Sequence, residues 1–305
     1  MEENKVLNKQ IINESFVVPK RDRTEEIRRL WYKFSMNKIS VMGLVIVIIV
    51  ITATLFRQWI APYPEHAGAF VDFANASRAP SPEHLMGTDT LGRDVLSRII
   101  YAFKGALTMG IGAIMIVVPF GGIVGLMAGY WKGRFISTAI MRIADVFLAL
   151  PALILVLCVS SIMKPNLTNS MLALCISWWP WYTRMVYGMV VSKRNEVYVK
   201  SAEILGANNW HIMIKEILPN CMAPIFTKMT LDIGWAILAG ATLSFVGMGE
   251  QAPIPSLGEM VSNGVNYLPD QWWISVFPAL AIMLIVLGFN LLGDGIKDML
   301  SNEGD

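Results

Sequence analysis

Residues 39–56 have the sequence ISVMGLVIVIIVITATLF, and this stretch decides the class of fold. It contains no charged residue and is bounded by Lys38 and Arg57. With its flanks it is long enough to cross the hydrocarbon core of a bilayer as a helix. Residues 1–38 are polar and highly charged, so they lack the apolar core of a cleaved signal peptide. The stretch therefore predicts an integral membrane protein whose first helix is retained.

The composition supports the same class of protein. Apolar residues make up 54% of the chain and charged residues 16%, with a mean hydropathy of +0.51. An average soluble domain has about 45–50% and about 25%, respectively. Six segments are long and apolar enough to cross a membrane: 39–56, 105–131, 143–163, 168–192, 223–249 and 272–292. The expected fold is all-α and integral to the membrane, with six transmembrane helices.

The positions of lysine and arginine predict the orientation. These residues concentrate in cytoplasmic loops of membrane proteins. Here they are dense before the first span, at 132–134 and within 191–219, whereas residues 250–271 contain none. Both termini are therefore expected to be cytoplasmic. The exceptions are Arg78, Arg93 and Arg98 in the first outer loop, which we interpret as part of a local structure.

The predicted organisation has three parts. A cytoplasmic segment covers residues 1–38, a transmembrane domain covers 39–300, and a tail covers 301–305. The domain contains outer loops at 57–104 and 250–271 and a long cytoplasmic loop at 191–219. Within the first segment, the apolar residues fall at helical spacing: Ile27, Leu30, Trp31 and Phe34. This pattern predicts a helix that lies on the inner membrane surface or packs against the protein's cytoplasmic side.

The cytoplasmic loop 191–219 has the sequence VSKRNEVYVKSAEILGANNWHIMIKEILP and is long enough to meet another protein. Its small residues fall at intervals that place several on one helical face: Ser201, Ala202, Gly206 and Ala207. Its apolar residues are expected to cover the membrane side: Ile204, Leu205, Trp210 and Ile214. We expect Gly206 to permit a bend and Pro219 to stop the helical hydrogen bonding before the fifth span.

Residues 198–220, YVKSAEILGANNWHIMIKEILPN, resemble the cytoplasmic EAA loop of ABC importer permeases. That pattern is Glu-Ala-Ala, three residues, Gly, nine residues, Ile, one residue and Leu-Pro. Lysine and serine replace its first two residues, and Glu216 replaces its isoleucine. The resemblance implies a coupling helix that seats in a cleft of an ATPase subunit. The residues that it assigns to this coupling are Lys200, Ser201, Ala202, Glu203, Leu205, Gly206, Ala207, Trp210, Leu218 and Pro219.

Further segments are similar to one branch of these permeases, the second permease chain of peptide and nickel importers. They are HLMGTDTLGRDVLSRIIY (84–101), GYWKGRF (129–135), MRIADVFLALP (141–151), LSFVGMGEQAPIPSLGEM (243–260) and FPALAIMLIVLGFNLLGDGIKDML (277–300). One departure is Gly240, where several relatives have an acidic residue. The resemblance implies a type I ABC importer permease fold that forms half of a translocation pathway for oligopeptides or dipeptides. Nickel chelates remain an alternative cargo.

The same resemblance implies the partners. They are a homologous second permease chain, two ABC ATPase subunits that bind ATP and magnesium, an extracytoplasmic substrate-binding protein and the lipid bilayer of a bacterial inner membrane. The chain itself contains no G-x-x-x-x-G-K-[ST] phosphate loop, GxSxG elbow or HExxH helix, so we expect neither catalysis nor a cofactor in it.

The remaining sequence signals exclude other classes only in part. Cys158, Cys175 and Cys221 have no CxxC spacing, so no metal site is expected. The net charge of +2 does not indicate nucleic-acid binding. Two other classes stay open: an ion-coupled secondary transporter, for which the sequence shows no convincing internal repeat, and a membrane scaffold.

Charged residues in and near the spans have alternative roles. Lys228 and Asp232 are four residues apart, so they share a helical face and are expected to pair. They either line the substrate pathway or form a structural pair near the cytoplasmic end of the fifth span. Arg142 and Asp145 are expected to orient the third span at the interface, rather than to touch cargo, and the same applies to Asp294, Lys297 and Asp298.

The outer loop contains a polar motif made of Gly87, Thr88, Asp89, Gly92, Arg93 and Asp94. It is compatible with an anion or metal site, but a self-contained loop held by Asp to Arg pairing is the favoured interpretation. Such a loop could also contact the binding protein that delivers cargo. His84 and His211 have no second histidine at ligand spacing and are expected to be ordinary surface residues.

Overall fold

The computed structural model describes residues 23–300 of the 305-residue chain, without the side chains of residues 23, 26 and 27. The expectations for residues 1–22 and 301–305 lie outside the described residues. Residues 23–300 contain no β-strand, and the one isolated bridge among them joins Thr88 to Asp94. The helices are α2 (Arg23–Met36), α3 (Lys38–Leu55), α4 (Arg57–Ile60), η1 (Pro64–Ala67), η2 (Phe73–Asn75), α5 (Val95–Tyr130), α6 (Phe135–Leu148), α7 (Ala152–Ile162), α8 (Leu167–Lys193), α9 (Val197–Ile204), α10 (Asn209–His211), η3 (Ile212–Ile217), α11 (Leu218–Phe245), α12 (Leu257–Val265) and α13 (Trp273–Leu300).

Several of these helices are long and apolar enough to cross a membrane. By length and composition, four qualify in the part of the chain that the structure describes: Lys38–Leu55, Val95–Tyr130, Asn209–Phe245 and Trp273–Leu300. The pair α6 and α7 is a fifth candidate if it counts as one bent span. Helix α8 has nearly the bounds of the predicted fourth span but does not meet the criterion alone. The all-α, multi-pass prediction is confirmed, and the number six stays a prediction.

The third span is not the continuous helix that the sequence predicts. Helices α6 and α7 meet at an angle of 89° across the break at residues 149–151. Pro151 caps α7 with a φ of −59°. A proline lacks the N–H that would continue the helix, and its ring disfavours helical backbone at the residue before it. The apolar run therefore contains a sharp turn that hydropathy alone does not register.

Helix α5 begins ten residues before the predicted span, at Val95 rather than Gly105. Asp94 caps this end: its carboxylate accepts the N–H of Ser97 at 2.8 Å. The early turns contain Arg98, which is 1% exposed because it is paired inside the protein. Since the pattern analysis treats arginine as a loop signal, it places the end of the outer loop too late. The outer loop 250–271 likewise contains a helix, α12.

Pro219 does not stop the helix, contrary to prediction. The chain is helical from Asn209 to Phe245, and Pro219 lies in the first turn of α11. The preceding segment η3 is a π-helix, in which the N–H of Leu218 donates to the carbonyl of Met213. The wider π-helical turn shifts the hydrogen bonds before Pro219, so the helix continues although proline has no N–H to donate. The second half of the segment 191–219 is therefore a helical extension of α11.

Glycines allow α5 and α8 to pack closely. A Cβ at Gly121 would lie 2.7 Å from the carbonyl oxygen of Trp179, and one at Gly125 would lie 2.5 Å from that of Thr183. The hydroxyl of Thr183 donates to the carbonyl of Gly121 at 3.1 Å. Small residues at helix crossings are typical of membrane bundles, where close backbone contact drives association. Gly121 and Gly125 therefore set the close approach of α5 and α8.

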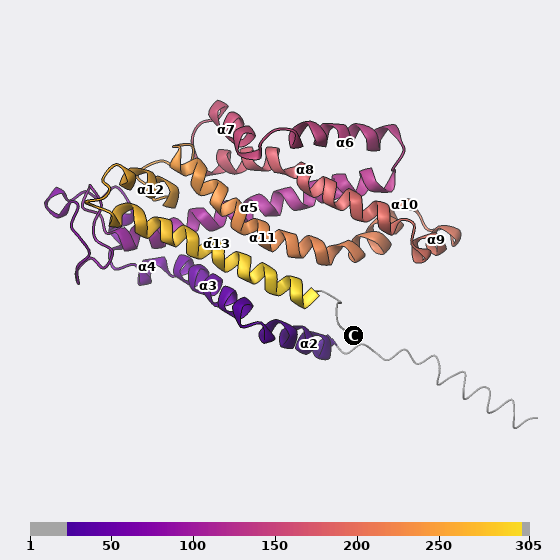
Figure 1. Ribbon diagram of the computed structural model, residues 1–305, viewed down its shortest axis with the longest axis horizontal. Coiled ribbons are helices and arrows are strands. Elements are labelled where there is room, and N and C mark those ends of the chain that lie inside the picture. The colour runs from indigo at the N-terminus through magenta and orange to yellow at the C-terminus, as the bar shows by residue number, and fades with distance from the viewer. Residues whose placement is uncertain (1–22, 301–305) are drawn as a thin grey trace, which may run out of the picture.

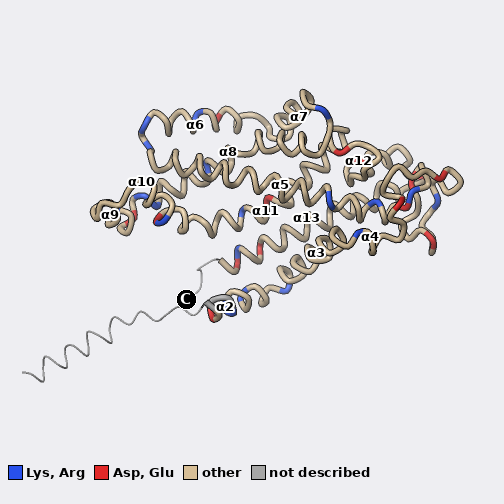
Figure 2. Tube along the Cα trace, turned by 180° about the vertical axis from the view of Figure 1, so that it is seen from behind, with Lys and Arg blue, Asp and Glu red and all other residues tan. Residues whose placement is uncertain are grey.

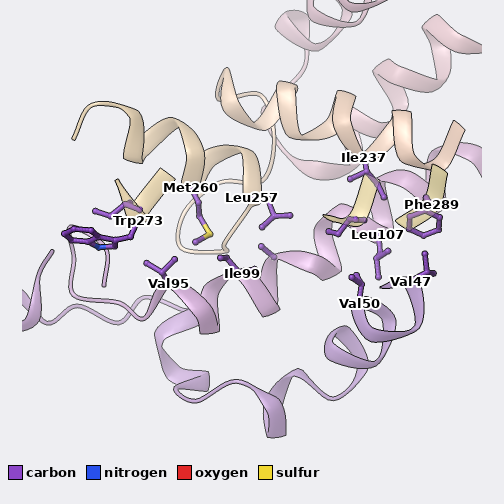
Figure 3. Close-up of a cluster of buried hydrophobic side chains, with 13 residues drawn as sticks. Val47, Val50, Val95, Ile99, Leu107, Ile237, Leu257, Met260, Trp273 and Phe289 are labelled. Carbon is purple, nitrogen blue, oxygen red and sulfur yellow. The ribbon is translucent and has the colours of Figure 1, made fainter. Parts of the chain in front are cut away.

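A cluster of apolar side chains holds the outer half of the bundle together. It joins α3, α5, α11, α12 and α13 (Figure 3). Among its members, Val95 is 0% exposed, Ile237 is 1% exposed and Leu257 is 3% exposed. Close packing of this kind has little room for rearrangement. The relative positions of α5, α11 and α12 are therefore fixed by this cluster.

The bundle is elongated, and its two ends differ. Helices α9 and α10 lie at one end, whereas α4, α12 and the outer segment 57–94 lie at the other (Figure 1). Charged residues gather mainly towards these ends (Figure 2). Helix α2 packs on α13, where Phe34 is 4% exposed and lies against Gly295, while Trp31 is 58% exposed. This helix thus contacts the protein through one residue of its predicted stripe and leaves another exposed; the side chain of Ile27 lies outside the described part.

Candidate functional site

The candidate coupling site is a helical hairpin, defined here as residues 197–217, at the end of the bundle shown with α9 and α10 (Figure 1). Helix α9 ends in a turn at Gly206, whose φ is +81°. The N–H of Ala207 donates to the carbonyl of Ala202 at 3.0 Å, and the N–H of Gly206 donates to that of Glu203 at 3.0 Å. These two bonds define a Schellman motif, in which a left-handed glycine ends the helix and two carbonyls of its last turn are satisfied. The predicted bend at Gly206 is confirmed.

Apolar side chains seat the hairpin on the bundle. Val199 of α9 and Ile212, Met213 and Ile217 of η3 are each 0% exposed. They pack on residues of α5, α8 and α11: Leu126, Tyr130, Val186, Val190, Cys221 and Ile225. Fully burying one such aliphatic side chain contributes about 1.5–3 kcal/mol. The hairpin is therefore anchored to these three helices as one body.

Contacts from Arg194, just before the hairpin, and from its middle at Asn209 and Trp210 tie it to the end of α5. Arg194 donates through Nη1 to the carbonyl of Tyr130, and its guanidinium lies 4.6 Å from the centroid of the Tyr130 ring. The Tyr130 hydroxyl donates to Oδ1 of Asn209 at 2.8 Å. Trp131 packs edge to face on Trp210 at 6.4 Å. Sequence reasoning did not single out Tyr130, Arg194 or Asn209, because they come from segments that only the fold brings together.

The outward face of α9 is partly apolar. Val197 is 79% exposed, Ile204 is 86% exposed and Leu205 is 87% exposed. Ile204 and Leu205 therefore do not pack on the bundle, and their predicted place on the membrane side stays a prediction. Val199 occupies the seat, and helical geometry then turns the residues near 197, 201 and 204 to the opposite face. Trp210 and Ile214 are about half exposed, at 53% and 51%.

The other predicted coupling residues divide between the two faces. Lys200, Ser201 and Glu203 are exposed on α9. Pro219, in the first turn of α11, is also exposed. Ala202, Ala207 and Leu218 are half-buried and pack against the seat. The outward face of the hairpin, defined by Val197, Lys200, Ser201, Ile204 and Leu205, is therefore the surface that a partner could cover.

The predicted pair in the fifth span is present. Nζ of Lys228 lies 2.9 Å from Oδ2 of Asp232. The hydroxyl of Tyr182, on α8, donates to the same oxygen at 2.8 Å. Lys228 and Asp232 also line an open cavity of about 480 Å³ with residues of α13. This contact with Tyr182 gives the pair a structural role between α8 and α11, and the pathway-lining role stays a prediction.

Asp145, one of the two charged residues noted in the third span, forms an ion pair with a residue of another helix. Asp145 of α6 pairs with Arg184 of α8, at 3.0 Å between Oδ1 and Nη2. Both side chains are partly exposed, so the pair contributes little to stability. Asp145 therefore contacts α8 rather than pairing with Arg142 of its own helix.

The outer-loop motif forms a compact turn around Asp89. Its Oδ1 accepts the N–H groups of Leu91 and Arg93, both at 2.9 Å. Its Oδ2 accepts from Nε of Arg93 at 2.7 Å and lies 3.6 Å from Nε of Arg98. The expected Asp to Arg pairing is therefore present. It also explains the basic residues of the outer loop, because Arg93 and Arg98 serve this turn.

Two glycines of the motif occupy positions that no other residue fits. Gly92 has a φ of +76°, and a Cβ there would lie 1.9 Å from the carbonyl oxygen of Asp72. Gly87 has a φ of +74°, and a Cβ there would lie 2.7 Å from Cδ1 of Trp273. Nε1 of Trp273 donates to the carbonyl of Thr88 at 3.1 Å. The backbone of the turn at Gly87 and Thr88 is thus in close contact with the Trp273 indole at the start of α13.

His84 is not a surface residue, contrary to prediction. It is 7% exposed, and its Nδ1 lies 2.9 Å from Oδ1 of Asp94. The N–H of Asp94 donates to Nδ1 of His66 at 2.9 Å, and His66 is also 7% exposed. The two histidines are 18 residues apart in sequence and meet only because the outer segment folds back on the start of α5. His211 is exposed, as predicted.

The contact of His66 predicts a dependence of stability on pH. Burial lowers the pKa of His66 below 6.5, although Glu65 and Asp94 oppose this shift. The unfolded chain, in which the histidine has a pKa of about 6.5, therefore binds the proton more readily than the folded chain. The stability that the neutral, buried His66 contributes is present above about pH 6.5 and is lost as the pH falls below this value. We expect the midpoint of thermal unfolding in detergent to be higher at about pH 8 than at about pH 5.5.

The variant His66→Asn is the control for this effect. An asparagine amide oxygen can accept the N–H of Asp94 without titrating in this range. The variant should therefore lose less of its midpoint between the two pH values than the parent chain. An equal loss in both proteins would assign the pH dependence to other groups.

Within residues 23–300, no group of three or more His, Cys, Asp and Glu side chains is arranged to hold a metal ion. The outer motif uses its carboxylates internally, on arginines and backbone N–H groups. These contacts brace the segment 57–94 against the start of α5. What the bundle offers instead is a rigid hairpin with an exposed face at one end and a braced outer segment at the other.

The structure is thus a bundle of membrane-length helices with an exposed hairpin at one end. Residues 121–303 match the family described as the binding-protein-dependent transport system inner membrane component. The chain belongs to this family. Residues 27–80 match the N-terminal transmembrane domain of oligopeptide transport permease C, which extends the resemblance to the segment before residue 84.

Named relatives cover nearly the whole chain. The probable D,D-dipeptide transport system permease protein DdpC of Escherichia coli K12 is 36% identical over 94% of this chain and 95% of its own length. The dipeptide transport system permease protein DppC of the same strain is 38% identical over 90% of this chain and 92% of its own. The glutathione transport system permease protein GsiD of Pectobacterium atrosepticum is 35% identical over 90% of each.

A solved structure supports the fold. The MetNI methionine ABC transporter, in an inward-facing conformation, has a chain that aligns with a TM-score of 0.54 at 15% identity. The alignment covers 67% of this chain and 97% of that one. The protein is a non-catalytic permease subunit of an ABC importer, whose ATP hydrolysis takes place on separate ATPase subunits.

Proposed function

We propose that this chain forms half of a translocation pathway for short peptides in a bacterial inner membrane. Its partners would be a homologous second permease, two ATPase subunits and an extracytoplasmic binding protein. The observation that carries the cargo is the match to dipeptide permeases over at least 90% of this chain. The proposed organisation keeps the predicted parts: a cytoplasmic segment at 1–38, the permease domain at 39–300 and a tail at 301–305.

The proposed topology has six spans with both termini in the cytoplasm. Helix α8 supplies one span, and α6 with α7 supplies a bent one, beside the four long apolar helices. The hairpin would then be cytoplasmic, and the segment 57–94 with α12 would lie outside. The excess of lysine and arginine around the hairpin supports this orientation.

The hairpin is the proposed point of energy transfer. The exposed face of α9 would sit in a cleft of an ATPase subunit, and closure of the ATPase pair on ATP would displace it. Because the chain is helical from Asn209 to Phe245, a displacement of the hairpin moves the whole of α11. Its apolar seat carries α5 and α8 along. Such rigid-body movement can alternate access to a pathway between two permease chains.

The substitution Leu205→Asp tests this contact. It places a charge in the outward face without touching the seat, since Leu205 is 87% exposed. We expect the ATPase subunits to co-purify with the parent chain and to be lost from the variant, with uptake of labelled dialanine lost as well. Burying an unpaired carboxylate in an interface is strongly unfavourable.

The matched control is Phe73→Asp, which adds the same charge to an outer residue that is 73% exposed. It should retain the ATPase subunits and stay at the same level in the membrane. Equal retention of ATPase by both variants would overturn the coupling role of the hairpin. Failure of the parent chain to support dialanine uptake would overturn the proposed cargo.

A further inference from the structure

A second feature lies at the opposite end of the bundle from the hairpin. A cavity of about 340 Å³ opens between the outer ends of α5 and α11 and the loop that leads to α12. Its walls include Met109, Ile237, Ile254 and Leu257. Pockets that bury small ligands have volumes of about 300–1,000 Å³ and mostly apolar walls with a few polar groups. The outer cavity, as we name it, is large enough for a small molecule.

The outer cavity carries one charge of each sign. Lys104 comes from α5, and Glu250 comes from the loop after α11. Among residues 23–300, neither side chain is within ion-pair distance of an opposite charge. An ammonium and a carboxylate that face a shared space without pairing to each other are complementary to a ligand with both charges.

The walls are held in place by packing. Ile237 and Leu257 belong both to the cavity wall and to the apolar cluster of Figure 3. A Cβ at Gly258 would lie 2.0 Å from the carbonyl oxygen of Ala241, so α12 starts in backbone contact with α11. The hydroxyl of Ser170 donates to the carbonyl of Met248 at 2.7 Å. The loop that carries Glu250 is thus fixed to α8 and α11, and the cavity is pre-formed.

One part of the wall is open. Gly105 lines the cavity, and a Cβ at this position would meet no heavy atom within 4 Å. Gly240, on the facing helix, also lines the cavity, but a Cβ there would lie 2.4 Å from Cγ of Met109, so this glycine serves the packing of α11 on α5. The absence of a side chain at Gly105 therefore keeps room for a ligand at the cavity wall.

We propose that the outer cavity is a subsite for the charged termini of a short peptide, with Lys104 binding the carboxylate and Glu250 the ammonium. This inference rests on the proposed peptide cargo. Every unmodified peptide has both termini whatever its side chains, so recognition through them suits varied sequences. The apolar walls accept side chains without demanding one. Because α11 is continuous with the hairpin and packs on α5 and α12 through the apolar cluster, the cavity would move with the hairpin as one body.

The test compares variants of the full transporter in cells that lack other peptide uptake. Lys104→Gln should lower the uptake efficiency for dialanine about tenfold, the loss expected for one charge-assisted hydrogen bond. It should have a smaller effect on dialanine amide, which has no carboxylate. Glu250→Gln should show the reverse selectivity, with the smaller effect on N-acetyl-dialanine. The controls are Lys164→Gln and Glu83→Gln, which remove exposed charges away from the cavity.

A steric variant provides an independent measurement. Gly105→Leu adds a side chain to the cavity wall, where its Cβ meets no heavy atom within 4 Å. Gly122→Leu is its control on the same helix, since a Cβ at Gly122 also meets no heavy atom within 4 Å. We expect only Gly105→Leu to lose uptake at equal membrane abundance. If both leucine variants behave alike, or if Lys104→Gln matches Lys164→Gln, the subsite is overturned while the peptide function stands. If the parent chain takes up no dipeptide, the proposed function fails and the subsite with it.

Discussion

Replacing Gly206 with valine is expected to abolish uptake while leaving the chain in the membrane. The residue has a φ of +81°, in the left-handed region that a β-branched side chain rarely adopts. Strain of this kind costs about 1–3 kcal/mol, which corresponds to about a 5- to 150-fold change in an equilibrium. The Schellman turn would open, and the outward face of α9 would lose its angle to η3. Uptake of labelled dialanine and co-purification of the ATPase subunits measure the effect.

The variant Gly206→Asn separates the effect of losing the left-handed backbone conformation from the effect of adding any side chain at this position. Asparagine is among the residues that enter the left-handed region most easily. Because a Cβ at Gly206 meets no heavy atom within 4 Å, no clash complicates the comparison. We expect Gly206→Asn to keep most of the uptake. If valine and asparagine have the same effect, the turn is not what the coupling site requires.

The substitution Asp89→Ala is expected to destabilise the outer segment by about 3–5 kcal/mol, the range for removing one partner of a buried ion pair. Arg98 is 1% exposed, and Asp89 is the carboxylate within ion-pair distance of it. The variant would also leave the N–H groups of Leu91 and Arg93 without their acceptor. The midpoint of thermal unfolding in detergent should fall, and trypsin should cleave after Arg93, which is buried in the parent chain.

Glu83→Ala is the comparison for this variant, because Glu83 is an exposed acidic residue of the same outer segment. Its midpoint and its resistance to trypsin should match those of the parent chain. Similar behaviour of Asp89→Ala would show that the motif around Asp89 is not a structural brace. A binding role would then become the better interpretation of this motif.

The two ends of the molecule are connected by one element. The helical stretch Asn209–Phe245 begins in the hairpin and ends beside the outer cavity. The contact of Tyr182 with Asp232 holds its middle to α8. A displacement of a few ångströms at the hairpin need not be relayed through flexible loops. The π-helix η3 allows this stretch to remain helical through Pro219.

Hydrophobic runs determined much of the fold from sequence alone. A stretch such as residues 39–56 has few alternatives to a membrane helix, because unpaired backbone groups are costly in lipid. Short motifs also carried their meaning: the Gly206 turn and the pairing of Asp89 with Arg93 are local, so their spacing in the chain is enough to predict them. The Lys228 and Asp232 pair is local in the same way.

Only the tertiary structure decided which face of each local element is used. Ile204 and Leu205 point outward because Val199, Ile212 and Met213 already fill the seat on α5 and α8, and no pattern within the loop encodes that choice. Likewise, His66 and His84 are buried because a folded outer segment brings both of them to Asp94. Helical and turn preferences depend on neighbours in sequence, whereas burial and pairing across helices depend on contacts between residues far apart in the chain.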